Sequence, residues 1–232
     1  MIQLRDFSDA RLEGHCVYCG NKPDTRDHVP SKVLLDEPYP VNLPIVPACN
    51  NCNQGFSKDE EYFACLLECI LRGSTDIDKL KSAKIRRILT AKPYLKAKLN
   101  EAKLKLNGQT FFKTEENRIR NVILKLARGH ASFENGGLFL QEPSLLRIQS
   151  ISNMNEIEKT KYFTLNMKLL PEVGIRALQR LIINEEIISE GWTVVQENKY
   201  MYSISQDYMN LCVKFLICNY LACEVIWDLT LI

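Results

Sequence analysis

No long uninterrupted apolar run is present in this sequence. The most apolar stretch, residues 211–232, is interrupted by Lys214, Glu224 and Asp228, and these charges exclude a simple membrane span. The first residues, MIQLRDFSDARLEGH, also lack the apolar core of a secretion signal. We therefore expect a cytoplasmic protein that does not bind membranes, a setting in which cysteines are rarely joined as disulfides.

The sequence also has little net charge, because 30 Lys and Arg residues face 28 Asp and Glu residues, giving +2. This balance argues against a histone-like or polybasic binder. The charges are nevertheless unevenly distributed: residues 1–71 hold 6 basic and 11 acidic side chains, whereas residues 72–105 hold 11 and 3. The asymmetry predicts a positive surface on residues 72–105 that meets a polyanion, although a solvated Lys-rich helix would have the same composition.

Histidine is scarce, and the three histidines of the chain limit the choice of a general base. His28 follows Asp27 directly and is the candidate, because an imidazole can accept a proton from water near neutral pH. His15 precedes a cysteine pair and is interpreted as a surface residue or as one that lies behind the metal ligands. His130 lies far along the chain and is interpreted as structural or as a cation at a helix C-terminus.

Cysteine is the residue type that the sequence has in excess, with nine copies. Four of them form two CxxC pairs separated by 29 residues: Cys16, Cys19, Cys49 and Cys52. Two such pairs can supply the tetrahedral four-thiolate site that structural zinc prefers. The remaining five lie among apolar residues and are expected to pack as small hydrophobic side chains: Cys65, Cys69, Cys212, Cys218 and Cys223.

Oxygen and nitrogen donors lie close to the cysteine pairs in the sequence. Asp27 and Asn53 can offer oxygen ligands to a hard divalent cation, and His28 can act beside them as a base. Arg26 and Lys32 flank the Asp-His pair and could bind a phosphate, or they are ordinary surface charges. Residue chemistry alone leaves two interpretations open, a catalytic metal site and a purely structural zinc ribbon with a polar loop.

The order of these motifs resembles the HNH (ββα-metal) nuclease superfamily. The matching elements are CVYC, DHVP, an Asn before the second cysteine pair, and CNNCN, within residues 14–63. The likeness is to the subgroup with an Asp-His pair, Asn as the last ligand and a four-cysteine zinc site. It implies a β-hairpin that carries the Asp-His pair, followed by a helix that carries the last ligand.

The resemblance also implies a role for each matching residue. Asp27 and Asn53 would bind the catalytic Mg²⁺ or Mn²⁺, His28 would activate water, and Asn42 would brace the loop that holds the histidine. Cys16, Cys19, Cys49 and Cys52 would bind structural Zn²⁺. Many members have His where this chain has Asn53, and Asn is the weaker ligand, so the choice of metal is open.

The sequence predicts an α+β fold with three regions. These are a zinc-stapled ββα-metal nuclease module over residues 1–73, a helical region over 74–130, and an α+β region with antiparallel strands over 131–232.

Local patterns place the main elements. Ser57 and Glu60 form a capping-box pattern for a helix that ends at Gly73. Residues 76–107 are helical in character, and Pro93 is expected to break them into two helices. A short strand, QTFFK, is expected to follow. Residues 115–129 form a further helix with Gly129 as its stop. The patterns GLFLQ and KYFTLNMKLL favour strands, residues 171–184 favour a helix, and the end of the chain favours an antiparallel meander. Glu197-Asn198 is expected to turn a hairpin of this meander.

These observations predict a metal-dependent endonuclease that hydrolyses phosphodiester bonds of nucleic acid, with DNA as the expected substrate. The alternative is a non-catalytic zinc-binding module that binds nucleic acid or a protein. Residues 131–232 contain no recognisable motif and could provide a homodimer or partner-protein contact. Members of the superfamily often serve in phage defence, toxins or mobile elements, an association that does not choose a pathway.

Overall fold

The computed structural model describes residues 12, 14–41, 43–164 and 191–231. Within these ranges the protein is a mixed α+β structure with five α-helices and nine strands, which form two hairpins and a five-stranded sheet. The α+β class predicted from the sequence is therefore confirmed. The chain divides into two compact units: Met1–Asn53 with Leu124–Ile232, and Gln54–Ile123. None of the described helices is long and apolar enough to cross a membrane.

The first unit begins with a small hairpin. Strand β1 (Thr25–His28) pairs antiparallel with β2 (Ile45–Ala48), so that Asp27 lies opposite Val46 and His28 opposite Ile45. The 3-10 helix η2 (Lys32–Leu34) lies in the long connection between them. Helix α1 (Asn50–Arg72) follows β2 after one residue.

The start of α1 was predicted wrongly from the sequence. The helix begins at Asn50, not at Ser57, because the backbone N–H of Asn50 donates to the Asp24 carboxylate at 2.5 Å. Asp24 thereby satisfies a helix N-terminal donor from 26 residues away and places negative charge at the positive end of the helix dipole. The end was predicted correctly, because Gly73 follows Arg72 in the left-handed conformation at φ +59°.

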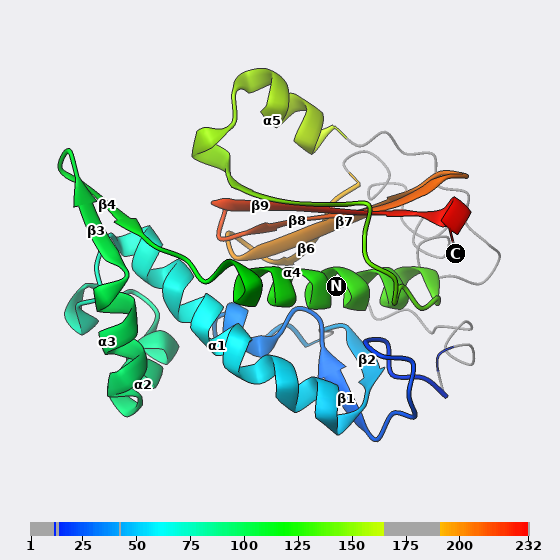
Figure 1. Cartoon of the computed structure of the whole chain (residues 1–232), viewed down its shortest axis with the longest axis horizontal. Coiled ribbons are helices and arrows are strands. Elements are labelled where there is room, and N and C mark those ends of the chain that lie inside the picture. The colour runs from blue at the N-terminus through cyan, green and yellow to red at the C-terminus, as the bar shows by residue number, and fades with distance from the viewer. Residues whose placement is uncertain (1–11, 13, 42, 165–190, 232) are drawn as a thin grey trace. The chain divides into compact units, whose positions relative to one another are not determined.

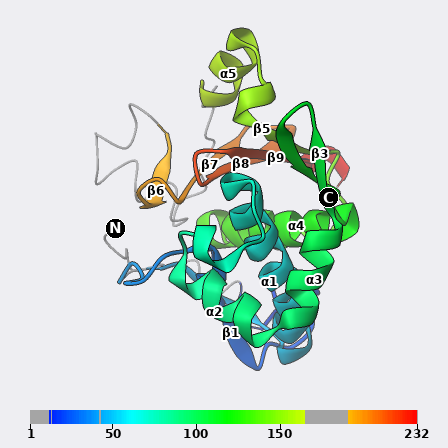
Figure 2. The same ribbon diagram turned by 90° about the vertical axis from the view of Figure 1, so that its left-hand side faces the viewer.

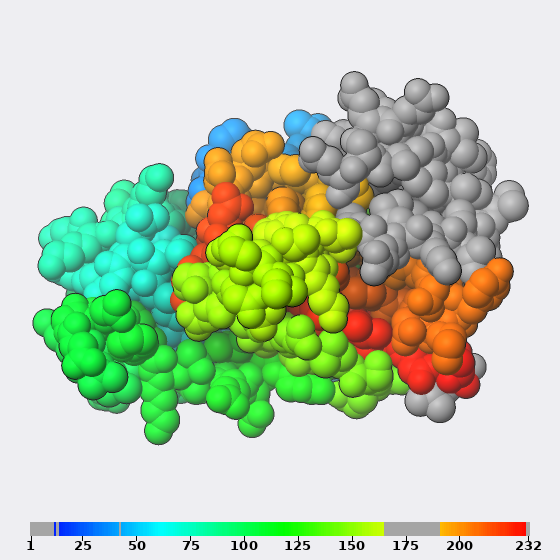
Figure 3. Space-filling view, turned by 90° about the horizontal axis from the view of Figure 1, so that it is seen from above, coloured from blue at the N-terminus to red at the C-terminus, as the bar shows by residue number. Residues whose placement is uncertain are grey.

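A five-stranded antiparallel sheet forms the rest of the first unit, in the order β5-β9-β8-β7-β6. Its strands are β5 (Leu145–Ser150), β6 (Thr193–Gln196), β7 (Tyr200–Gln206), β8 (Asn210–Ile217) and β9 (Leu221–Asp228). Helix α4 (Glu116–Asn135) belongs to this unit from Leu124 onward, and that part runs along one face of the sheet, while α5 (Glu156–Phe163) lies on the other (Figures 1 and 2). Figure 3 shows α5 lying over the strands of that outer face. Short 3-10 helices precede α5 and follow β9, at Ile151–Asn153 and Leu229–Leu231.

The predicted C-terminal meander is present, and Asn198 turns the β6–β7 hairpin with a φ of +58°. The proposed strand GLFLQ is not a strand, and residues 161–163 belong to α5. The helix expected at residues 171–184 lies outside the described residues.

Gly129 does not end a helix as predicted, because α4 continues to Asn135. The boundary expected between the regions 74–130 and 131–232 therefore falls inside helix α4. A Cβ atom at Gly129 would lie 2.6 Å from Val29 Cγ2, far inside contact distance. Glycine at this position lets the helix approach the chain that follows β1.

The second unit contains the C-terminal part of α1, the N-terminal part of α4 and the chain between them. That chain forms η3 (Ile77–Lys79), α2 (Ala83–Ala91), α3 (Pro93–Glu101), β3 (Lys103–Leu106) and β4 (Gln109–Phe112). Pro93 starts α3, in agreement with the predicted break. Residues 103–106 were expected to be helical but form a strand, because Asn107 and Gly108 at φ +50° and +78° close a tight hairpin.

Candidate functional site

The four cysteines of the two CxxC pairs lie together in the first unit. All four Sγ atoms are within 4.8 Å of one another, and Cys19 Sγ is 3.7 Å from Cys49 Sγ. A tetrahedral zinc site with Zn–S bonds of about 2.3 Å has sulfur–sulfur edges of about 3.8 Å. The cluster therefore fits a metal ion such as Zn²⁺, as the spacing predicted.

Burial raises the pKa of two thiols of this cluster, and a bound cation would have the opposite effect. It raises the pKa of Cys16 and of Cys52 above the ordinary thiol range, because a desolvated thiolate is unfavourable. The backbone N–H of Cys52, 3.4 Å from Cys49 Sγ, instead lowers the pKa of Cys49. A bound divalent cation would stabilise all four thiolates.

Asp27 is buried, with 7% of its surface exposed. Its Oδ2 accepts a hydrogen bond from Tyr18 Oη at 2.7 Å and forms an ion pair with Lys125 Nζ at 2.7 Å. Among the residues that the structure describes, no hydrogen bond or ion pair reaches Oδ1. One carboxylate oxygen is thus engaged inside the protein while the other is available for a ligand.

Lys125 is the residue of this site that sequence reasoning missed. It lies on α4 with a side chain only 1% exposed, and it also donates to Ser31 Oγ at 2.8 Å, from 94 residues away. A signal was present in the sequence, because Lys125 is the one charged residue of the apolar run VILKLA, residues 122–127. The structure buries all six of these residues. A lysine is almost never fully buried unless it is paired.

His28 is the last residue of β1 and is partly buried. Neighbouring side chains of a strand point to opposite faces, so the imidazole is not part of the Asp27–Lys125 contact. Burial lowers the pKa of His28 below its ordinary value of 6.5, and the positive charges of Lys32 and Lys125 lower it further against the opposing effect of Asp27. The imidazole is therefore neutral at pH 7 and able to accept a proton.

Asn53 lies in the first turn of α1 and is tied to β1. Its Nδ2 donates to Thr25 Oγ1 at 2.9 Å and to the backbone oxygen of Arg26 at 3.2 Å. These bonds fix the amide plane beside the strand that carries Asp27 and His28. No hydrogen bond within the described residues engages Asn53 Oδ1, and none joins the side chains of Asn53 and Asp27.

The other residues singled out from the sequence have different surroundings. Asn42 lies outside the described residues. Arg26 is exposed beside His28, and His15 is an exposed residue whose ring Nδ1 is 3.1 Å from the backbone oxygen of Gly20. His130 is fully buried, where its Nε2 is 2.8 Å from Tyr200 Oη, so it holds α4 against the sheet.

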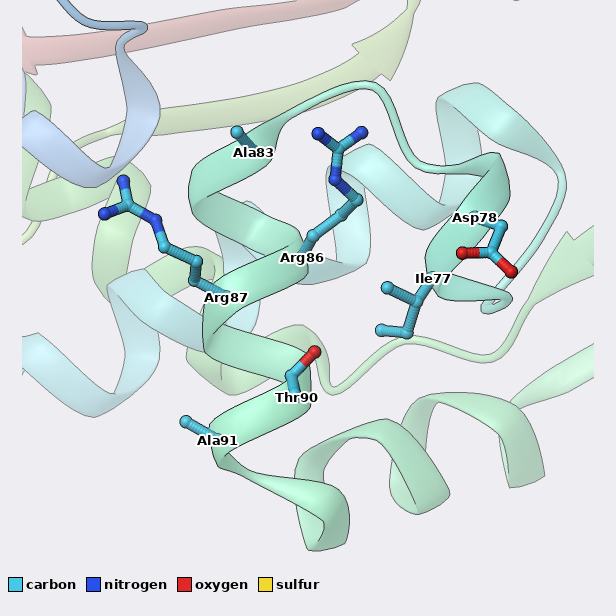
Figure 4. Close-up of a pocket in the computed structure, with 7 residues that line it drawn as sticks. All are labelled: Ile77, Asp78, Ala83, Arg86, Arg87, Thr90 and Ala91. Carbon is cyan, nitrogen blue, oxygen red and sulfur yellow. The ribbon is translucent and has the colours of Figure 1, made fainter.

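The second unit has an open cavity of about 550 Å³ beside η3 and α2 (Figure 4). It is lined by Ile77, Asp78, Ala83, Arg86, Arg87, Thr90 and Ala91. The Arg86 guanidinium donates to the backbone oxygen of Leu80 at 2.9 Å. Figure 4 shows the Arg87 side chain pointing away from the Arg86 side chain. Arg86 is thus engaged within its own unit, and none of the predicted site residues lines this cavity.

Comparisons with protein families, with curated proteins and with solved structures find no match to this chain.

Proposed function

We propose that this protein is a metal-dependent endonuclease of the HNH (ββα-metal) type, which hydrolyses phosphodiester bonds of nucleic acid, preferably DNA. One observation carries the proposal: a four-cysteine cluster brackets a hairpin that bears Asp27 and His28, and the helix that follows bears Asn53 in its first turn. The same elements in the same order are what the sequence resemblance implies. We place the reaction in the cytoplasm, where a role in defence against phage would fit the family association.

The donor set suits a hard divalent cation. In this donor pair, Asp27 Oδ1 and Asn53 Oδ1 make no hydrogen bond or ion pair within the described residues. Oxygen ligands are those that Mg²⁺ and Mn²⁺ prefer. When bound, such an ion would stabilise the negative charge that develops on the phosphate and on the leaving oxygen. Asn53 contributes no charge, so Asp27 supplies the only formal negative charge of this pair.

The protein side chains supply the remaining steps. His28, in its neutral form, accepts a proton from the water that attacks phosphorus, while the bond from phosphorus to the 3′ oxygen breaks. Arg26 is exposed beside it on the strand and is placed to contact a phosphate. The Asn53 amide, held by Thr25 and Arg26, keeps the start of α1 in register with this strand.

A cleavage assay with a matched histidine control tests the proposal. His28→Ala should still bind zinc and keep the native fold, because His28 is neither a zinc ligand nor a core residue. It should cleave nucleic acid about 10²–10⁴-fold more slowly than the wild type. His15→Ala removes the other histidine of the same module and should cut at the wild-type rate. Plasmid, single-stranded DNA and RNA, each with Mg²⁺ and with Mn²⁺, define the substrate. Wild-type cleavage by His28→Ala would refute the mechanism.

A second function is a zinc-stabilised module that binds nucleic acid or a protein without cutting it. The buried ion pair of Asp27 with Lys125 favours this alternative, since a nearby ammonium reduces the attraction of a carboxylate for a cation. Binding of nucleic acid by the wild-type protein without cleavage under every metal condition would select it. Homodimer or partner contacts through residues 131–232 would then be the next property to measure.

A further inference from the structure

The Asp27 carboxylate is held by two donors that come from outside its hairpin. Tyr18 stands between Cys16 and Cys19 in the first cysteine pair and donates to Oδ2 at 2.7 Å. Lys125 comes from α4 and its Nζ is also 2.7 Å from Oδ2. Both donors contact the same oxygen, so they fix the rotation of the carboxylate and leave Oδ1 on the other side.

The lysine is itself held in place. Its Nζ donates to Ser31 Oγ at 2.8 Å and lies 5.8 Å from the centre of the Tyr18 ring. Gly129, one helical turn further on, brings α4 close enough for this contact, since a Cβ there would lie 3.3 Å from Tyr18 Oη as well as against Val29.

A buried ion pair of this kind is a poor device for stability alone. The desolvation cost of two charges offsets their attraction, and well-packed apolar residues of similar volume often serve as well or better. A lysine with a 1% exposed side chain, placed among apolar neighbours and aimed at one carboxylate oxygen, therefore points to a role in orienting that carboxylate.

We propose that Lys125 and Tyr18 are positioning residues of the cation site, an inference that rests on the proposed function. They bind Oδ2 so that Asp27 offers only Oδ1 to the divalent cation, in a fixed direction. The ammonium of Lys125 also weakens the pull of the carboxylate on the cation. Affinity for the ion is thus reduced in exchange for a defined geometry, and α4 becomes part of the site.

The test uses the full-length, zinc-loaded protein with Mn²⁺ as the probe, and measures binding and cleavage separately. Lys125→Met keeps the volume of the side chain and removes its charge. The Kd for Mn²⁺, followed by electron paramagnetic resonance, should fall by about threefold or more, because the repelling charge is gone. The kcat for cleavage should fall by about tenfold or more, because the carboxylate is no longer held in one orientation.

Two further variants separate charge from geometry. Tyr18→Phe keeps the ion pair and removes one hydrogen bond, so kcat should fall while the Kd for Mn²⁺ stays within about twofold. Lys125→Arg keeps the charge, so its Kd should also stay near the wild-type value. Lys214→Met removes a partly buried lysine that lies 3.7 Å from Glu224 on the sheet, and should change neither quantity.

Each outcome decides the matter. A purely structural role predicts that Lys125→Met weakens Mn²⁺ binding and loses zinc together, and that result, or an unchanged Kd and kcat, overturns the inference. If Lys125→Met does not fold, Tyr18→Phe decides, and a wild-type kcat in that variant overturns the inference. The two proposals can fail separately. If the Kd for Mn²⁺ changes in Lys125→Met as expected but the wild-type protein cleaves no nucleic acid, the proposed nuclease function is refuted and the effect of Lys125 on cation affinity is retained.

Discussion

Asp27 and His28 are neighbours in sequence but have opposite surroundings. Asp27 is buried against a lysine and a tyrosine, whereas His28 is partly exposed and kept neutral by burial and by nearby positive charge. Residue chemistry predicted both as site residues. It also predicted the four cysteines as one cluster, and the pairing of β1 with β2 between the two cysteine pairs brings their sulfurs together. The apolar run around Lys125 marks it as a buried, paired lysine, but residue chemistry could not identify its partners, because its contact with Ser31 spans 94 residues.

The lowered pKa of His28 gives a pH profile at the residue scale. Cleavage requires the neutral imidazole, so activity is present above the pKa of His28 and is lost as the pH falls through it. Because that pKa lies below the ordinary value of 6.5, the midpoint of the pH profile, where the cleavage rate is half of its maximum, should lie below pH 6.5. The measurement is the cleavage rate at saturating Mg²⁺ between about pH 5 and about pH 8. A midpoint above 6.5, or the same profile in His28→Ala, would contradict this assignment.

Helix α1 is the element on which zinc and the proposed catalytic cation both depend, because Cys52 and Asn53 are adjacent in its first turn. Sequence pattern identified where it ends, since Gly73 is a local signal. Its start depends on Asp24, which directly precedes β1 and accepts a hydrogen bond from the backbone N–H of Asn50, the first residue of the helix. The strand β3 was missed although its signals were local, an alternation of Lys and Leu followed by Asn-Gly.

Removing one thiolate should therefore affect both metal sites through this helix. Cys52→Ser should lose the structural zinc, lower the melting temperature and abolish cleavage, because thiolate–metal bonds replace a hydrophobic core there. Zinc content by elemental analysis and thermal unfolding measure these effects. Cys212→Ser, a cysteine of strand β8, is the matched control and should retain its zinc. Full zinc content in Cys52→Ser would contradict the four-thiolate site.

At the scale of the whole molecule, charge is divided between the two units. Residues 54–123 contain 15 Lys and Arg against 9 Asp and Glu, a balance of +6, whereas the rest of the chain contains 15 against 19. The predicted positive surface therefore belongs to the unit that lacks the cysteine cluster. Composition revealed this division, but not that the N-terminal hairpin and the C-terminal sheet form one unit. That depends on contacts such as Asp36 N to Gln196 Oε1 at 2.8 Å, 160 residues apart.

Binding of nucleic acid should depend on this basic unit and weaken steeply with salt. Lys81→Glu with Lys105→Glu reverses two exposed charges, and leaves Arg86 intact because it is bonded to Leu80. The affinity should fall, and the slope of log K against log salt should become shallower by about 0.9 for each phosphate that the variant no longer neutralises. Lys161→Glu, on α5 in the other unit, serves as the control. Unchanged binding would return residues 72–105 to the interpretation as an ordinary solvated surface.

Gly129 shows how little room for variation a residue without any functional group can have. The smallest side chain that could replace its hydrogen, a methyl group, already collides with Val29. Relief of that collision would push α4 outward and carry Lys125 away from Asp27. A side chain at Gly129 should therefore disturb the contact of Lys125 with Asp27, one helical turn away, although Gly129 itself performs no chemistry.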